Sequence, residues 1–175
     1  MTKSPVTLIV VKPRPVQIAT ADTHVVSWTP TTNYGSSREA LTVSSPRRGE
    51  EALIYLRFPI GGLDITKNIC ITMYVLTSTY SGVSTLRFHP IIDAWEEMYV
   101  TWNTKPRLGD LVGYVSAEKI PKEKWVSFVS PPEVTRRLIK RDSLEVCLRA
   151  LSETYFALSI LTRETAYKPH LKPYT

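Results

Sequence analysis

"NICITMYVLTS", residues 68–78, is the stretch that indicates the fold class of this chain most directly. Apolar side chains occupy every second position of its first half: Ile69, Ile71, Met73 and Val75. Neighbouring side chains of a strand point to opposite faces of a sheet, so this period of two indicates a strand with one face toward a core. The stretch therefore predicts a β-strand, with Cys70 on the face away from the core.

Runs with the same period continue on both sides of residues 68–78. They are ATADTHVVS (19–27), EALTVSS (39–45), EALIYLRFPI (51–60), STLRFHPII (84–92), YVTWN (99–103), LVGYVSA (111–117), KWVSFVS (124–130), SLEVCLRAL (143–151) and TYFALSILT (154–162). Short turn signals such as GGLD and YSG separate them. Strands at this spacing predict an all-β chain, folded as one antiparallel β-sandwich of jelly-roll type.

One segment, PPEVTRRLIKRDS (131–143), has a helical period instead. Val134 and Leu138 are four residues apart, and the two prolines at its start suit the first turn of a helix. We expect a short surface helix of about two turns that covers one end of the sandwich. Its polar face carries a basic patch, predicted to be exposed and to contact an anionic surface: Arg136, Arg137, Lys140 and Arg141.

The chain begins with an apolar run that a Lys-Pro-Arg-Pro spacer, residues 12–15, separates from the rest. The run consists of Val6, Thr7, Leu8, Ile9, Val10 and Val11. The spacer prolines lack amide donors and interrupt any continuous strand, so we divide the chain into an arm, 1–16, and a sandwich domain, 17–175. The arm is predicted to pair with a sheet edge of a neighbouring subunit. Folding back onto its own sandwich is the alternative that the sequence leaves open.

Composition and charge restrict the environment and the partners. The hydrophobic fraction of 43% is sufficient for a core, and the formal charge of +6 either favours anionic partners such as acidic glycans or serves solubility. Nucleic acid is not the expected partner. Neither an apolar run of about 18 residues nor a secretory signal is found, so we expect no membrane span. We expect an extracellular, cell-surface or virion protein, whose signal was removed or which leaves its cell within a particle. Scarce Gln and Asn beside 13 Pro favour a thermophilic source.

The two cysteines, Cys70 and Cys147, show neither metal-site spacing nor a CxxC motif. Each falls in a predicted strand, on the face opposite the expected core face. Two inert thiols are the favoured interpretation. A disulfide between them stays open, because the sequence does not supply the separation of their Cα atoms.

Several short motifs occur in an order that resembles a known family. They are TADTHV, TNYGSSREALTV, ALIYLRFPI, ITMYVL, AWEEMYVTWNTKP, WVSFVS and LTRETAYKPHLKPY. Together, over residues 18–175, they resemble the DNRLRE domain, a β-sandwich family related to the disaggregatase repeats and to a class of carbohydrate-binding modules. The resemblance implies a jelly-roll-like, non-catalytic module of surface or secreted proteins. We expect the chain to differ from that pattern in its arm and in standing without an attached enzyme domain.

Residues that could support catalysis are present but are not arranged for it. Glu96 and Glu97 are adjacent in a predicted strand and would point to opposite faces, so they do not form the carboxylate pair of a glycosidase. The three histidines are scattered, and no GxSxG or HExxH motif accompanies them. We therefore expect no enzyme. Three tryptophans are expected in the core: Trp95, Trp102 and Trp125.

Two sets of residues are candidates for binding. Sugar rings stack on flat apolar side chains, and four aromatic residues near predicted loops form the candidate glycan platform: Trp28, Tyr34, Tyr80 and Tyr114. Three oxygen-bearing residues are weak calcium candidates: Asp22, Asn33 and Asp64. Asx turns explain the same residues without a metal, and no other cofactor is expected.

Two functional classes follow from these observations. The preferred hypothesis is a structural or adhesive subunit of an extracellular or virion assembly, which associates with itself or related subunits through sheet edges and the arm. The alternative is a stand-alone carbohydrate-binding module for acidic polysaccharide. A polysaccharide hydrolase or lyase is a distant third.

Overall fold

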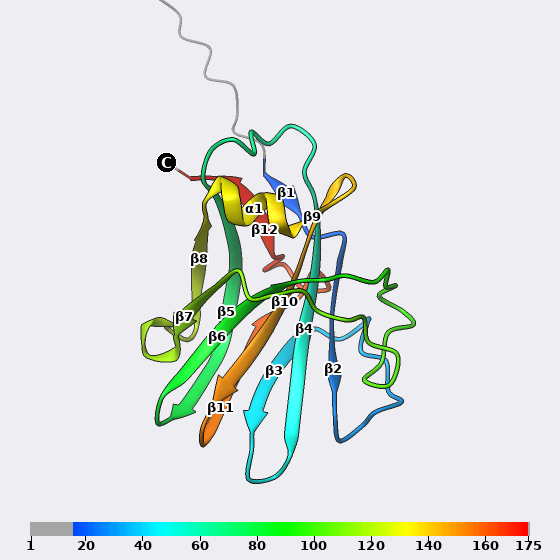
Figure 1. Ribbon diagram of the computed structural model, residues 1–175, viewed down its shortest axis with the longest axis vertical. Coiled ribbons are helices and arrows are strands. Elements are labelled where there is room, and N and C mark those ends of the chain that lie inside the picture. Colours follow the sequence, from blue (N-terminus) through cyan, green and yellow to red (C-terminus); the bar gives the residue numbers. More distant parts are fainter. Residues whose placement is uncertain (1–15, 175) are drawn as a thin grey trace, which may run out of the picture.

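The structure, a computed structural model that describes residues 16–174, is an all-β fold in which one sheet curls into a half-barrel (Figure 1). The strands are β1 (Gln17–Ile18), β2 (Ala21–Val26), β3 (Glu39–Ser45), β4 (Glu50–Pro59), β5 (Ile69–Ser81), β6 (Ser84–Pro90), β7 (Gly113–Ser116), β8 (Lys124–Ser130), β9 (Ile139–Lys140), β10 (Ser143–Ser152), β11 (Tyr155–Leu161) and β12 (His170–Pro173). A 3₁₀ turn (Ala117–Lys119) and helix α1 (Pro132–Leu138) complete the described elements. The predicted all-β fold class is confirmed. The predicted arm strand, Val6–Val11, lies outside the described residues.

All strand pairs are antiparallel, and the sheet follows the order β1-β12-β5-β11-β3-β4-β10-β6-β7. Three strands lie off this path: β2 pairs with β4, β8 with β5 and β9 with β10. Among the described strands, β7 therefore pairs only with β6, and β8 pairs only with β5. These two strands are free edges that the loop of residues 117–123 connects.

The main core fills the concave side of the curled sheet. Strand β4 shows how the sequence builds it, because Ile54, Leu56 and Phe58 alternate along the strand and are fully buried in this core. The predicted strand at residues 68–78 behaves in the same way, with Ile71 and Met73 buried in the same cluster. Period two therefore predicted the main core correctly.

A second apolar cluster covers the opposite face of the same sheet region. Tyr55 of β4 and Cys147 of β10 are fully buried there, beneath Trp95 and Val100 of the long loop between β6 and β7, residues 91–112. Cys147 lies on the sheet face opposite the main core, as predicted. That face is not exposed, however, because the 91–112 loop covers it. Cys70 is also buried, and both cysteines are free thiols, so the favoured interpretation is confirmed.

The strand predicted at residues 99–103 is wrong, because this segment forms turns. Its backbone groups bond locally and to the β2–β3 loop: the Val100 amide donates to the Glu96 carbonyl at 3.0 Å, and the Asn103 amide donates to the Pro30 carbonyl at 3.1 Å. Trp102 is half-buried against the second cluster, with the Lys105 amine 3.9 Å from its ring centroid. Trp102 was predicted as a core residue of a strand, but it lies on a loop and is only partly buried at the edge of the second cluster.

Helix α1 confirms the helical segment and lies across one end of the sandwich (Figure 1). Pro131 precedes its first turn, and Leu138 is buried in the main core. The short strands β1, β9 and β12 were not predicted, since two to four residues carry too little periodicity to be recognised. Across residues 16–174, no helix is long and apolar enough to cross a membrane.

Candidate functional site

The four aromatic residues of the predicted platform do not form one surface. Trp28 lies in the β2–β3 loop and Tyr114 on the edge strand β7, with 46% and 67% of their surfaces exposed. Tyr34 is half-buried and stacks on His24, with ring centroids 4.3 Å apart. Tyr80 lines a separate hollow beside the β5–β6 turn. No ring–ring contact joins any two of the four, so their joint role in glycan binding stays a prediction.

A different set of rings forms a contiguous aromatic platform on the convex side of the sheet. Trp125 of β8 meets Tyr74 of β5 edge to face at 5.8 Å, and Tyr167 of the β11–β12 loop lies 4.6 Å from Tyr74 and 6.0 Å from Trp125. His170 of β12 completes the group, 5.3 Å from Trp125. We call these four residues the aromatic platform.

Trp125 was predicted in the core, and this prediction is wrong: 45% of its surface is exposed. The register of β8 explains the position. Val126 and Phe128 point into the sandwich, so Trp125 points outward and stands beside Tyr74, its pairing partner across β5. The alternation within KWVSFVS was the signal that could have placed Trp125 outside. No comparable signal exists for Tyr167, which long-range folding brings to the platform.

Polar groups border the aromatic platform. Thr72 and Ser127 face each other across β5 and β8, with their hydroxyl oxygens 2.9 Å apart. Lys172 of β12 stands two residues from His170 and therefore on the same face of the sheet. Because Trp125 and Tyr167 each expose about half of their surface, flat apolar rings stand beside hydroxyl and ammonium groups. This combination suits a sugar ring, which stacks by one face and bonds through its hydroxyls.

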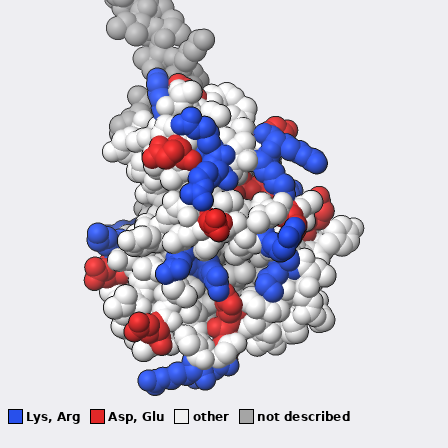
Figure 2. Space-filling model, in the orientation of Figure 1, with Lys and Arg blue, Asp and Glu red and all other residues white. Residues whose placement is uncertain are grey.

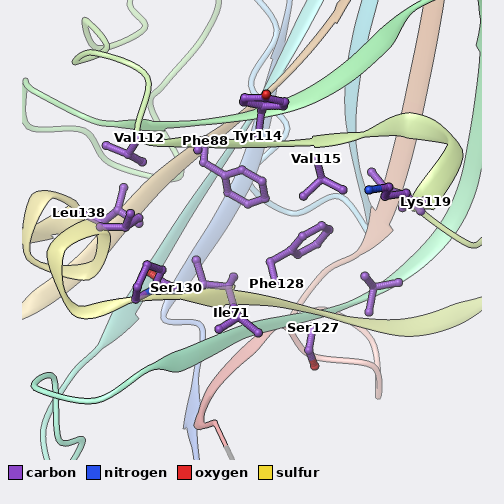
Figure 3. A pocket seen from close by; sticks show the side chains of 16 residues that line it. Ile71, Phe88, Val112, Tyr114, Val115, Lys119, Ser127, Phe128, Ser130 and Leu138 are labelled. Atoms are coloured by element: carbon purple, nitrogen blue, oxygen red, sulfur yellow. The ribbon is translucent and has the colours of Figure 1, made fainter.

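An apolar groove separates the free edges of β7 and β8 (Figure 3). Its volume is about 450 Å³, and Phe88, Val115 and Phe128 point into it. Helix α1 borders one end of the groove with Leu138. Few polar side chains line the groove, so it offers little with which to orient a sugar.

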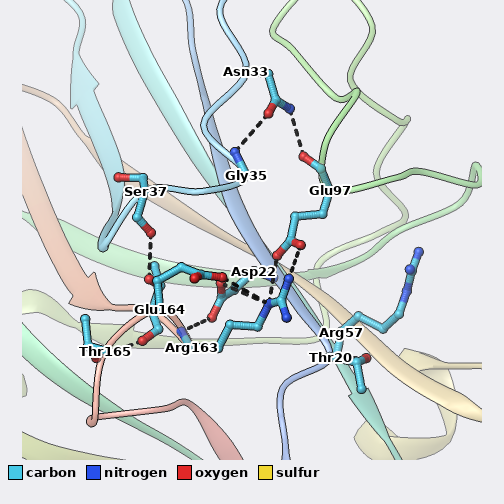
Figure 4. A network of polar contacts seen from close by, with 11 residues as sticks. Thr20, Asp22, Asn33, Gly35, Ser37, Arg57, Glu97, Arg163, Glu164 and Thr165 are labelled. Atoms are coloured by element: carbon cyan, nitrogen blue, oxygen red, sulfur yellow. Dashed lines mark hydrogen bonds and ion pairs between the residues drawn. The ribbon is translucent and has the colours of Figure 1, made fainter.

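Residues from three of the sequence motifs, TADTHV, AWEEMYVTWNTKP and LTRETAYKPHLKPY, meet in a buried ionic network (Figure 4). Arg163 forms an ion pair with Glu97, and its backbone amide donates to Asp22 Oδ2 at 2.6 Å. The Asp22 amide in turn donates to Glu97 Oε1 at 2.8 Å. Glu97 is buried whereas Glu96 is exposed, so the two carboxylates differ in environment, although the segment is a turn and not the strand assumed in the sequence-based prediction. The network fastens the 91–112 loop to β2 and to the segment after β11.

The Asp22 carboxyl group is held largely out of water. Its Oδ1 atom is buried without a hydrogen-bond partner, 4.0 Å from Arg163 Nε. Burial raises the pKa of Asp22 to about 6, although the bond from the Arg163 amide acts in the opposite direction. Burial also lowers the pKa of His24 to about 4.

The three weak calcium candidates do not lie together. Asn33 Oδ1 accepts the Gly35 amide at 3.0 Å, and Asp64 Oδ1 accepts the Thr66 amide at 3.1 Å, which are the Asx turns considered from the sequence. The hydrogen bonds from Thr66 lower the pKa of Asp64. Among residues 16–174, no three His, Cys, Asp or Glu side chains are grouped as a metal site requires. Calcium binding stays an untested prediction.

The basic patch is largely exposed, as predicted. Arg136, Arg137 and Arg141 are exposed, while the Lys140 amine donates to the Ile92 carbonyl at 2.7 Å. Figure 2 shows Lys and Arg side chains over the part of the surface that carries α1, with acidic side chains between them. A second basic group, Arg47 and Arg48, lies in the β3–β4 turn. Both side chains line a hollow of about 380 Å³, together with hydroxyl-bearing side chains such as Ser81 and Thr154.

Comparison with known proteins agrees with the site geometry. The sequence matches the model of carbohydrate-binding module family 96 over residues 15–173, nearly its whole length. No curated protein sequence matches the chain. The predicted relation to carbohydrate-binding modules is thus confirmed, whereas the match does not single out the DNRLRE domain. The chain belongs to carbohydrate-binding module family 96.

Proposed function

We propose that this protein is a non-catalytic module that binds a polysaccharide on the aromatic platform. The observation that carries the proposal is the exposed Trp125 ring, which Tyr74, Tyr167 and His170 surround. Membership of a carbohydrate-binding family supports it, and so does the burial of Glu97 in an ion pair, because an engaged carboxylate is a poor general acid or base. The family match favours this alternative over the preferred sequence-based hypothesis of a structural subunit.

The polysaccharide we propose is an acidic one. Lys172 lies on the platform face, and Lys168 of the β11–β12 loop lies two residues before His170, with its carbonyl oxygen 3.1 Å from His170 Nδ1. The formal net charge of +6 adds a long-range attraction for a polyanion. We also propose an extracellular location, since a polysaccharide of this kind is met outside the cell.

Substitution of one tryptophan tests the platform. Trp125→Ala should weaken binding to the preferred polymer at least tenfold, because stacking on the indole ring is lost. The matched control is Trp28→Ala, since Trp28 is exposed to the same extent, 46% against 45%, but lies in the β2–β3 loop and not on β8. Binding would be measured by calorimetry and affinity electrophoresis against alginate, a heparin-like polymer and neutral glucans.

The two variants and the three polymers separate the hypotheses. Equal losses in Trp125→Ala and Trp28→Ala, or a loss in Trp28→Ala alone, would place the site elsewhere. Preference for a neutral glucan would contradict the acidic class while leaving the platform intact. Binding to none of the polymers would favour the structural-subunit hypothesis.

A further inference from the structure

We propose that the groove between β7 and β8 receives the apolar segment Val6–Val11 of a second copy of this chain, as an added strand on the free edge of β8. The segment belongs to the part of the chain outside the described residues. The groove is distinct from the aromatic platform, because Val126 and Phe128 of the groove point to the opposite face of β8 from Trp125. The docking identifies the acceptor surface for the assembly predicted from the sequence.

The free edge of β8 supplies the backbone partners for such a strand. Strand β8 has seven residues, Lys124–Ser130, and pairs only with β5 among the described strands. No further backbone hydrogen bond joins it to another segment within residues 16–174, apart from those of the turn into α1. A six-residue strand is about 20 Å long and matches this edge, whereas β7 is limited to four residues. Added strands on open sheet edges satisfy exposed amide and carbonyl groups.

The groove supplies the apolar contacts. Val126 and Phe128 of β8 line one side and Val115 of β7 lines the other, and the volume of about 450 Å³ accommodates several aliphatic side chains. In a strand over residues 6–11, one face carries Val6, Leu8 and Val10 and is wholly apolar, whereas the other carries Thr7, Ile9 and Val11 and is interrupted by one hydroxyl group. The apolar face therefore points into the groove.

The position of β1 favours a second copy over the chain's own arm. Strands β1, β12, β5 and β8 are consecutive neighbours at this end of the sheet, so a slot beyond β8 lies four strand spacings, about 19 Å, from Gln17. Six Cα steps join Val11 to Gln17 and span at most about 21 Å. The chain's own arm would need a fully straight crossing over a curved, twisted sheet. An arm from a second copy has no such restriction.

Face-specific substitutions in the full chain test the docking. The unsubstituted protein should show at least twice the mass of one chain in light scattering at micromolar concentration. Leu8→Asp should return it to the mass of one chain, since it places a charge in the apolar groove. Thr7→Asp adds the same charge to the opposite face of the strand and should leave assembly unchanged. A protein that is monomeric throughout, or equal effects of the two substitutions, would overturn the proposal.

Cross-linking decides which chain supplies the arm. Leu8→Cys combined with Val126→Cys should give a covalent dimer on a non-reducing gel after mild oxidation. A cross-link within one chain would overturn the second-copy assignment, and the absence of any cross-link would overturn the docking itself. Leu8→Cys with Val83→Cys is the control, because Val83 is 78% exposed in the β5–β6 turn, outside the groove lining. This control pair should not cross-link.

Discussion

Two residues show how the ionic network depends on details of single side chains. A Cβ atom at Gly35 would stand 2.5 Å from the Glu97 carbonyl oxygen, so only glycine allows the β2–β3 loop to approach the 91–112 loop this closely. Asn33 bridges the same two loops, with its amide nitrogen 2.8 Å from the carbonyl oxygens of Glu97 and Val100. The sequence marked Asn33 and Gly35 as a turn, but their partner 64 residues away could not be read from local spacing.

The Asp22 carboxyl group should make stability depend on pH. Its pKa of about 6 lies above the ordinary value of 3.8, so its contribution is fully present below about pH 4 and is lost as the pH rises through 6. Relative to Asp22→Asn, which does not titrate, the protein should lose up to about 3 kcal/mol of unfolding free energy between pH 4 and pH 7. His24 titrates in both proteins, so its opposite contribution cancels in the difference.

Chemical denaturation of both proteins at several pH values measures this effect. A stability difference that stays constant from pH 4 to pH 7 would show that Asp22 is ionised throughout, with Arg163 compensating its charge.

Some elements could be predicted from the local spacing of apolar residues, whereas others depend on contacts with residues far away in the sequence. Strands β4 and β5 were predictable because one face of each is continuously apolar, and α1 because its apolar residues are four apart. Residues 99–103 have the composition of a strand, yet turns replace it, since side chains and carbonyls of the β2–β3 loop take its hydrogen bonds. The aromatic platform likewise combines β8, which alternation predicts, with Tyr167, which only the folded chain brings there.

The 91–112 loop should depend on Arg163 for its attachment. Arg163→Met leaves Glu97 and Asp22 buried without their cation, which should cost roughly 2–3 kcal/mol of stability after allowance for the partial exposure of Arg163. Arg107→Met is the matched control in the same loop, because its ion pair with Asp93 is exposed and should matter little. Thermal unfolding of both variants measures the difference, and equal shifts in melting temperature would refute the special role of Arg163.

The whole molecule combines a basic surface, an aromatic platform and the free edges of β7 and β8. Figure 1 places α1 at one end of the sandwich and the β3–β4 turn at the other, so Arg136–Arg137 and Arg47–Arg48 are basic groups at opposite ends. Screening by salt acts over about 8 Å at physiological ionic strength. Added salt should therefore weaken the contacts of either basic group with a long polyanion more than it weakens stacking on Trp125. The salt dependence of the affinity separates the two contributions.

Charge reversal at the two ends should identify the end that the polyanion follows. Arg136→Glu with Arg137→Glu should weaken binding to an acidic polymer severalfold at low salt and reduce the salt dependence of the affinity. Arg47→Glu with Arg48→Glu changes the net charge equally and serves as the control. Titrations from 20 mM to 500 mM salt measure both, and identical responses would assign the effect to net charge alone.

The two free thiols report on the motions of this fold without any introduced probe. Burial raises the pKa of both thiols, so neither reacts readily in the closed structure. Cys147 becomes accessible only when the 91–112 loop leaves the second cluster, whereas Cys70 lies within β5, beside Lys172 of β12 and on the platform face of the sheet. Their labelling rates under native conditions therefore separate local opening of the loop from opening of the sheet. A polysaccharide that binds on the platform should slow the labelling of Cys70 and leave that of Cys147 unchanged.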